Sequence, residues 1–333
     1  IVGVAMTYSF DKRLAAGFSR ARLFEGVFKR AAVLFLLGMI LAGFPNFRLI
    51  LPYILVIVGL EFIYKNEPIL GLGDTPKAKR NKLVGWAVVA FSVIWFIVDF
   101  KHFSGPAYDF RFSAIWPTET PVEDGRIIRI PGVLQRIALV FLFAAPIMFF
   151  FKTNRQRLGW IIGLTAGYWI VMIIGEQYFG DWKPQPSWHG GGPTDVPFRG
   201  GINEWIDSRL LGNHLLGGRP DPEGILSTIP AIATTLFGVL TGSLLKSEKS
   251  KTEKTADMFF YGCILTTIGA FWHYWFPINK KIWTSSYVFF MAGMALFFLA
   301  FCYYLIDVKG KKRWTTPFVI FGTNPIYVFF ASG

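Results

Sequence analysis

The sequence predicts an all-α fold, a polytopic integral membrane helical bundle with about nine to ten transmembrane segments. Apolar residues make up 53% and aromatic residues 18% of the 333 positions, which is typical of a chain that lies largely in lipid. Long runs of Phe, Leu, Ile, Val and Ala carry almost no charge, and about 20 such residues span a bilayer as a helix. Short basic clusters separate these runs, as expected of the loops between helices.

Ten apolar segments are candidates for the helices of this bundle. They cover residues 1–10, 31–44, 50–64, 83–99, 133–151, 158–175, 226–245, 256–276, 283–305 and 316–333. The first segment is too short to cross a hydrocarbon core, and the chain also stops within an apolar run. We therefore expect one transmembrane domain, residues 1–333, that is truncated at both ends.

The distribution of basic residues predicts the orientation of the bundle. If the first segment runs inward, the cytoplasmic loops are residues 11–30, 65–82, 152–157, 246–255 and 306–315. These loops hold most of the 34 Lys and Arg residues, as the positive-inside rule predicts. The net charge of +13 is therefore interpreted as a topology signal, so the expected partner is membrane lipid and no nucleic acid is expected.

Two long loops, residues 99–131 and 176–225, then face outward, and the second is predicted to be a long extracytoplasmic loop. Both are rich in Trp, Gly, Pro and acidic residues, and loops of this length are usually functional or disordered. The stretch 46–126 is interpreted as an inserted helical hairpin with an outer loop. The two cysteines, Cys263 and Cys302, do not have the spacing of metal ligands, so no metal is expected.

Polar groups stand at the start of one apolar run, where Arg129 is followed by Gln135 and Arg136. Burying a charge in lipid is costly, so such groups usually face a protein interior or a cavity. Farther along, Asp221 and Glu223 precede a helix whose start they could cap. Glu223 also has the reach to meet Arg129 or Arg136. Such a pair would close the outer mouth of a pocket, or it could be purely architectural.

Several motifs occur in a characteristic order along the chain. They are RIPGVLQR (129–136), NEWIDSRLLGNH (203–214), DPEGILSTIPA (221–231), WTSSY (283–287), DVKG (307–310) and GTN (322–324). In these motifs the chain resembles the heparan-alpha-glucosaminide N-acetyltransferase family, including its bacterial NagX-like relatives. The resemblance implies acetyl-CoA as co-substrate at the cytoplasmic face and a glucosamine-type amino sugar as acceptor on the other side. It implies a bacterial inner (cytoplasmic) membrane protein, and it places the family's reacting histidine upstream of residue 1.

The matched motifs supply the candidate site residues. The substrate-binding candidates are Arg129, Gln135, Arg136, Asp221, Glu223, Trp283, Ser286 and Asn324. His214 is an accessory candidate, because a histidine near an acid pair could orient the sugar or assist proton transfer; the alternative is a loop histidine that bonds a backbone carbonyl. Capping is the simpler account of Ser286. Asn324 could bond across helices beside Pro325 or contact the pantetheine arm.

Two functional classes remain open at this point. The first is a transmembrane N-acetyltransferase that moves acetyl from cytoplasmic acetyl-CoA to an extracytoplasmic amino sugar. The second is an amino-sugar permease, for example for N-acetylglucosamine, or a transport-associated protein. A transporter is expected to show inverted repeats and broken helices, whereas this sequence shows no internal repeat and gathers its polar motifs at one face. That favours the enzyme. A second copy of the chain, forming a homodimer, is a further candidate partner.

Overall fold

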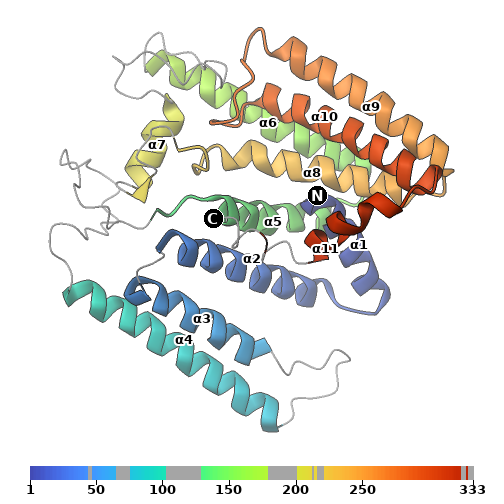
Figure 1. Cartoon of the computed structure of the whole chain (residues 1–333). Helices are drawn as coiled ribbons and strands as arrows, with labels where there is room; N and C mark the ends of the chain where they lie inside the picture. The colour runs from blue at the N-terminus through green and yellow to red at the C-terminus, as the bar shows by residue number, and fades with distance from the viewer. Residues whose placement is uncertain are drawn as a thin grey trace.

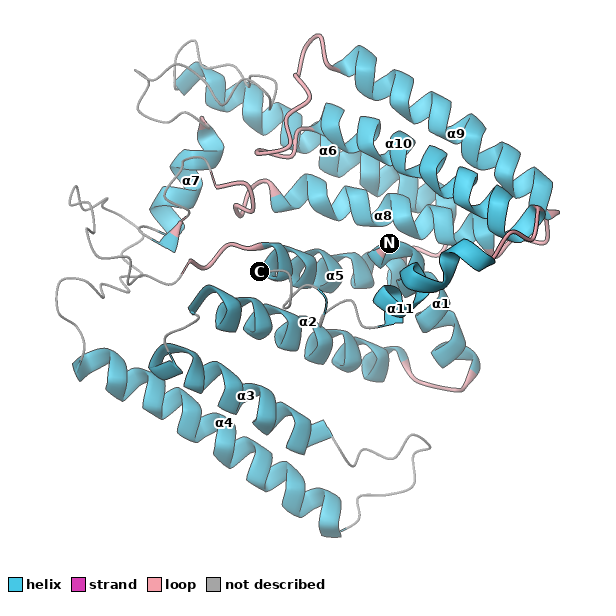
Figure 2. Cartoon of the chain, in the orientation of Figure 1, coloured by secondary structure: helices cyan, strands magenta, loops and turns pink. Residues whose placement is uncertain are grey.

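The chain folds as a bundle of helices that lie roughly side by side (Figure 2). The computed structural model describes residues 1–43, 47–64, 76–102, 129–178, 201–211, 214–215, 221–323 and 328. Within these ranges the secondary structure is helical and includes no strand. The predicted all-α fold class is therefore confirmed.

Eleven α-helices are present in the described ranges (Figure 1). They are α1 (Val2–Ala15), α2 (Arg20–Gly43), α3 (Phe47–Tyr64), α4 (Pro76–His102), α5 (Val133–Phe150), α6 (Asn154–Tyr178), α7 (Ile202–Leu211), α8 (Thr228–Leu245), α9 (Lys251–Trp272), α10 (Ser285–Tyr303) and α11 (Thr316–Thr323). A π-helical turn, Tyr304–Val308, and a 3-10 turn, Arg313–Thr315, connect α10 to α11.

Each of the ten predicted segments overlaps a helix, and helices also occur within two of the predicted loops. Residues 11–30 were expected to form a loop, whereas α1 and α2 are separated only by a short turn at residues 16–19. Gly17 makes this turn with a φ of 84°, a backbone conformation that glycine adopts without steric cost. The other case is α7, which lies within the expected outer loop 176–225; the extracytoplasmic position of this segment stays a prediction. Its many polar residues gave no apolar run to detect.

Four helices in the described ranges are long and apolar enough to cross a membrane. They are Val133–Phe150, Asn154–Tyr178, Thr228–Leu245 and the continuous helix Ser285–Val308. These helices make the chain an integral membrane protein. The larger expected number of nine to ten spans stays a prediction, because other helices carry more charge. Helix α2, for example, begins with the charged sequence RARLFEGVFKR.

The centre of the bundle is formed by α1, α5 and α8, with α2 and α6 packed around them. Phe10 of α1 packs against Phe149 of α5, with ring centroids 4.9 Å apart and the rings tilted by 36°. On its other side α1 lies directly on the backbone of α8. A Cβ atom at Gly3 would overlap the carbonyl oxygen of Thr235 and lie 2.6 Å from the amide nitrogen of Val239. Small residues allow such close helix packing, which is how helices associate in lipid.

Two helix pairs flank this centre. Helices α9 and α10 pack along each other on one side, and α3 and α4 pack along each other on the other side, where α3 contacts α2 (Figure 1). Lys29 of α2 and Glu61 of α3 form an ion pair at 3.2 Å. The α3–α4 pair lies in the stretch 46–126, whose status as an insertion stays a prediction.

Candidate functional site

The chain gathers polar side chains at both ends of its central helices. One end, called here the Arg129 end, contains the start of α5, the end of α6, α7 and the start of α8. The opposite end, the Lys152 end, contains the turn between α1 and α2, the turn between α5 and α6, and the end of α8. Because α5 and α8 run through the bundle centre, they connect the two ends.

At the Arg129 end, Arg129 holds two carboxylates together. Its Nε donates to Asp221 Oδ2 at 3.1 Å and its Nη2 donates to Asp221 Oδ1 at 2.7 Å. The same Nη2 donates to Glu223 Oε2 at 2.6 Å. Burial opposes the positive charge of Arg129, but the bonds to Asp221 and Glu223 outweigh it and raise the pKa of the guanidinium. The predicted meeting of Glu223 with an arginine is confirmed for Arg129.

Arg136 lies deeper, in the first turns of α5, and only 7% of the residue is exposed. Its Nη2 donates to the hydroxyl of Ser227 and, at 3.5 Å, to the carbonyl of Gly224. One face of its guanidinium lies over the Trp283 ring, 4.9 Å from the centroid. The Nε and Nη1 of Arg136 are buried and have no hydrogen-bond partner in the described part of the chain.

Trp283 holds Arg136 in place from an unusual backbone conformation. Its φ is 52°, in the left-handed region, which costs a residue with a side chain about 1–2 kcal/mol. The indole Nε1 donates to Thr234 Oγ1 at 3.1 Å, and the ring packs edge-on against Tyr287. Strained residues are found where surrounding structure fixes them, often at functional sites. Here the strain aims the indole face at the guanidinium.

Asp207 of α7 is a buried carboxylate beside Arg136, with 1% of the residue exposed. Its Oδ1 accepts from the backbone N–H of Ile225 at 2.8 Å and so stabilises the turn before α8. Burial raises the pKa of this carboxyl to about 6, and the nearby charge of Asp221 raises it further, against the charge of Arg136. A Cβ atom at Gly224 would overlap Asp207 Oδ2, so any larger residue here would displace the Asp207 carboxylate.

Asn203, one helical turn before Asp207, is 2% exposed and is oriented by a hydrogen-bond chain. Its Nδ2 donates to the hydroxyl of Tyr168 at 2.6 Å, and that hydroxyl donates to the carbonyl of Ile282 at 2.6 Å. Because the Tyr168 proton is committed to Ile282, the hydroxyl must accept from Asn203, which fixes the amide orientation. The Oδ1 of Asn203 is then left buried without a donor among the described residues.

These side chains form one unit, named here the Arg136 cluster. Its members are Arg129, Arg136, Tyr168, Asn203, Asp207, Asp221, Glu223 and Ser227. The charge of Arg136 acts on Asp207, Asp221, Glu223 and Tyr168, which places all four around it. Four of these residues were predicted from the sequence, namely Arg129, Arg136, Asp221 and Glu223, whereas Tyr168, Asn203, Asp207 and Ser227 were not. The available signal was the spacing of Asn203 and Asp207, four residues apart and so on one helix face.

Other predicted site residues lie apart from the Arg136 cluster or are engaged elsewhere. Gln135 is buried against α2, where its Nε2 lies 3.7 Å from the sulfur of Met39. Ser286 is 0% exposed and donates to the carbonyl of Phe276, while Thr284, rather than Ser286, is the residue that caps α10. The backbone carbonyl of His214 accepts from Ile130 at 3.0 Å. Asn324 lies outside the described residues.

The capping role predicted for Asp221 is also different in the structure. Its Oδ1 accepts from the backbone N–H of Glu223 at 2.9 Å, which stabilises its own turn rather than the start of α8. Asp207 instead accepts from the backbone just before α8. The turn of Asp221 positions its side chain and that of Glu223 toward Arg129. Substrate binding by these residues stays a prediction.

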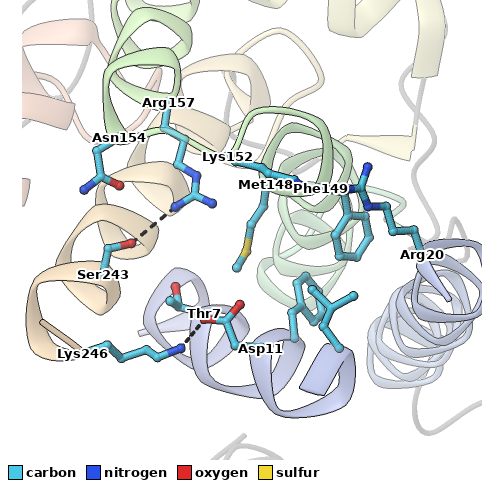
Figure 3. Close-up of a pocket in the computed structure, with 12 residues that line it drawn as sticks. Thr7, Asp11, Arg20, Met148, Phe149, Lys152, Asn154, Arg157, Ser243 and Lys246 are labelled. Atoms are coloured by element: carbon cyan, nitrogen blue, oxygen red, sulfur yellow. Dashed lines mark hydrogen bonds and ion pairs between the residues drawn. The ribbon is translucent and has the colours of Figure 1, made fainter. Parts of the chain in front are cut away.

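At the Lys152 end, a cavity of about 590 Å³ opens between α1, α2, α5, α6 and α8 (Figure 3). This volume is within the range of about 300–1,000 Å³ that is usual for small-molecule sites. Its wall is apolar on one side, where Phe10, Met148 and Phe149 lie. The sequence could not predict this cavity, because its lining comes from five separate helices and turns.

The polar lining of the cavity is strongly basic. Four cations, Arg20, Lys152, Arg157 and Lys246, line the cavity together with one carboxylate, that of Asp11. Asp11 pairs with Lys246, as Figure 3 shows. Arg157 is 9% exposed and donates to the carbonyl of Phe151 at 3.0 Å and to Ser243 Oγ at 3.3 Å. Within the described ranges, Arg20 and Lys152 have no ion-pair partner.

Comparison with known proteins gives relatives of one kind. The chain is 27% identical over 327 residues to the heparan-alpha-glucosaminide N-acetyltransferase of Mus musculus, covering 84% of this chain and 46% of the relative. It is 31% identical over 251 residues to the Homo sapiens protein of the same name, covering 61% of this chain and 36% of the relative. The chain thus spans less than half the length of these relatives. No family model matches it. These two similarities support a distant relationship of the chain to the heparan-alpha-glucosaminide N-acetyltransferases.

Proposed function

We propose that the whole protein is a transmembrane N-acetyltransferase that takes acetyl from acetyl-CoA at the Lys152 end and delivers it to an amino sugar at the Arg129 end. One observation carries this proposal: the same central helices present a basic cavity at one end and a buried Arg–carboxylate cluster at the other. The two relatives named for this chemistry support the reaction type. We propose a bacterial inner membrane as the location, with the Lys152 end in the cytoplasm.

The cavity suits the donor because coenzyme A carries several phosphates on a nucleotide. Arg20 and Lys152 have no carboxylate partner among the described residues, so their charge is available to an anion. Arg157 is already held by Phe151 and Ser243 and offers a fixed guanidinium, the geometry that suits phosphate. Helix α6 also begins at the cavity with Asn154, so the positive end of its dipole favours an anionic group.

The Arg136 cluster suits the acceptor because it offers both charges, with Arg136 and Asp207 buried and Arg129 partly exposed. Acetyl transfer breaks the thioester bond to sulfur, forms a bond to the amine nitrogen and releases a proton from that nitrogen. The proton needs a basic group, and the developing negative charge on the acetyl oxygen needs a donor. The cluster contains carboxylates and an arginine with spare N–H groups. An amino sugar carries no phosphate, so the basic cavity favours the enzyme over an amino-sugar permease.

The proposal is tested with membranes that contain the full-length protein and labelled acetyl-CoA, with and without glucosamine. We expect acetylated sugar to form only when both are present. Replacing both free cations, Arg20→Gln with Lys152→Gln, should raise the KM for acetyl-CoA about tenfold or more, because each contributes to phosphate binding. Lys249→Gln, at the same end but outside the cavity and paired with Asp257, is the matched control and should leave the KM unchanged.

One result would reject the enzyme and favour the permease. It is the absence of acetylated sugar together with saturable uptake of N-acetylglucosamine into vesicles. If the double replacement leaves the KM for acetyl-CoA unchanged, the reaction would stand but the cavity would not be the acetyl-CoA site.

A further inference from the structure

Two buried side chains of the Arg136 cluster have hydrogen-bonding groups that nothing in the described part of the chain satisfies. Arg136 has two spare donors, Nε and Nη1, and Asn203 has one spare acceptor, Oδ1. Both residues are more than nine-tenths buried, so water does not reach these atoms from the surface. A buried polar group without a partner costs about 1–3 kcal/mol, so such groups need an explanation.

The spare groups are held in fixed positions rather than left loose. Arg136 is fixed on one edge by Ser227 and Gly224 and on one face by Trp283. Asn203 is fixed by Tyr168, which in turn is bonded to the carbonyl of Ile282. A site whose donors and acceptors are already oriented binds its ligand with a smaller entropic loss.

The unpaired donors of Arg136 and the unpaired acceptor of Asn203 lie in the same part of the fold. Arg136 lies over the ring of Trp283, and the carbonyl of the neighbouring Ile282 accepts from the Tyr168 hydroxyl that holds Asn203. The Nη2 of Arg136 also donates to the carbonyl of Gly224, next to Ile225, whose N–H donates to Asp207, one turn from Asn203 on α7. Arg136 and Asn203 therefore approach the same space from α5 and α7.

The surrounding charges decide which class of ligand fits. Asp207, Asp221 and Glu223 already act on Arg136, so an additional anion would be repelled by three carboxylates. A neutral ligand must accept hydrogen bonds from Arg136 and donate one to Asn203. A secondary amide has both groups, since its C=O accepts and its N–H donates in opposite directions.

We propose that Arg136 and Asn203 form a subsite for the acetamido group of an N-acetylated amino sugar, with Arg136 donating to the amide oxygen and Asn203 accepting from the amide N–H. The subsite deepens the proposed function and rests on it for the identity of the sugar. It adds a specificity: the site recognises the acetylated nitrogen itself, the group that distinguishes the product from the free amine. Each of the two side chains contributes one half of that recognition.

The test measures equilibrium binding of N-acetylglucosamine, glucosamine and glucose to the purified full-length protein in lipid nanodiscs, without acetyl-CoA. We expect N-acetylglucosamine to bind about tenfold or more tightly than glucose, because glucose lacks the amide. Asn203→Leu and Arg136→Gln should each reduce the affinity for N-acetylglucosamine about tenfold and leave that for glucose nearly unchanged. Arg209→Gln, on α7 where Arg209 packs on Trp205 outside the cluster, is the control and should change neither.

Two further variants keep the test valid if the first pair does not fold. Arg136→Lys keeps the cation beside the carboxylates but removes the planar Nε and Nη1 donors, so the amide preference should fall while the protein stays folded. Asn203→Asp keeps acceptor oxygens, so the amide preference should persist.

Several outcomes would overturn the subsite. One is equal affinity for N-acetylglucosamine and glucose, which would mean that the amide is not recognised. Another is an amide preference that survives both Asn203→Leu and Arg136→Lys, which would mean that a trapped water satisfies these groups. The transfer assay separates this proposal from the enzyme proposal. An amide preference without acetyl transfer would retain the subsite and reject the enzyme, whereas transfer without amide preference would do the reverse.

Discussion

Replacing Arg129 should destabilise the protein strongly, because it would remove the guanidinium to which both Asp221 and Glu223 are hydrogen-bonded. The Asp221 side chain is 0% exposed and that of Glu223 is 17% exposed, whereas Arg129 itself is 27% exposed. Removing one partner of a buried ion pair costs about 3–5 kcal/mol. The partial exposure of Arg129 places Arg129→Gln at the lower limit, so we expect a loss of about 3 kcal/mol in the free energy of unfolding.

A double-mutant cycle isolates the interaction from other effects of the substitution. Asp221→Asn removes the charge that Arg129 binds with two hydrogen bonds, so the double variant should be less destabilised than the sum of the single variants. The expected coupling is about 2 kcal/mol, within the range seen for residues in direct contact. The measurement is reversible unfolding in mixed micelles at neutral pH and low salt.

The control is an ion pair that is more exposed than the pair of Arg129 and Asp221. Lys249 pairs with Asp257 at the other end of the bundle, but half of the Lys249 side chain is exposed. Lys249→Gln should therefore produce no measurable change, as is usual for surface ion pairs. If Arg129→Gln is as neutral as this control, or if the cycle shows no coupling, Arg129 does not hold the Arg129 end together.

Two more predictions follow from burial and close packing. Burial raises the pKa of Asp207 to about 6, against 3.8 unperturbed, so between about pH 4 and pH 6 the folded state binds a proton that the unfolded state has lost, and stability falls as pH rises. Asp207→Asn should remove up to about 3 kcal/mol of this fall, which would be measured as a flatter dependence of the free energy of unfolding on pH from 4 to 7. Gly3→Ala should lower the free energy of unfolding by about 2 kcal/mol, because the new Cβ atom forces α1 away from α8. Gly159→Ala, whose Cβ would meet no atom within 4 Å, should instead stabilise α6 by about 0.5–1 kcal/mol. Equal shifts in the melting temperatures of the two alanine variants would contradict the close approach of α1 to α8.

Local pattern predicted the helices well, and it failed where contacts between distant helices decide the position of a residue. Gln135 and Arg136 are neighbours in one motif and were expected at one site. Successive residues of a helix point about 100° apart, so Gln135 packs on α2 while Arg136 faces the turn before α8. Arg129 and Glu223 could be paired from sequence because each is polar at the edge of an apolar run. The Lys152-end cavity could not, since no single run of residues outlines it.

The basic residues show why charge counting alone cannot separate topology from function. Lys152 and Arg157 share one short predicted loop and contribute equally to the positive-inside signal. In the structure Lys152 is exposed, whereas Arg157 is buried and bonded to Phe151 and Ser243 in the cavity wall. Burying a guanidinium is costly unless its donors form hydrogen bonds. An arginine that only set the topology would therefore be expected to stay in water, as Lys152 does.

Arg136 lies within a membrane-spanning helix, so its charge cannot serve as a loop signal for topology. Its neighbours Ser227, Trp283 and the three carboxylates offset part of the cost of burial, yet they contact only Nη2 and one face of the guanidinium. The two remaining donors are the part of that cost that the described fold does not repay. If an amide binds these two donors, N-acetylglucosamine should stabilise the unsubstituted protein more than it stabilises the Arg136→Lys variant. Thermal unfolding of both proteins with and without the sugar measures this difference.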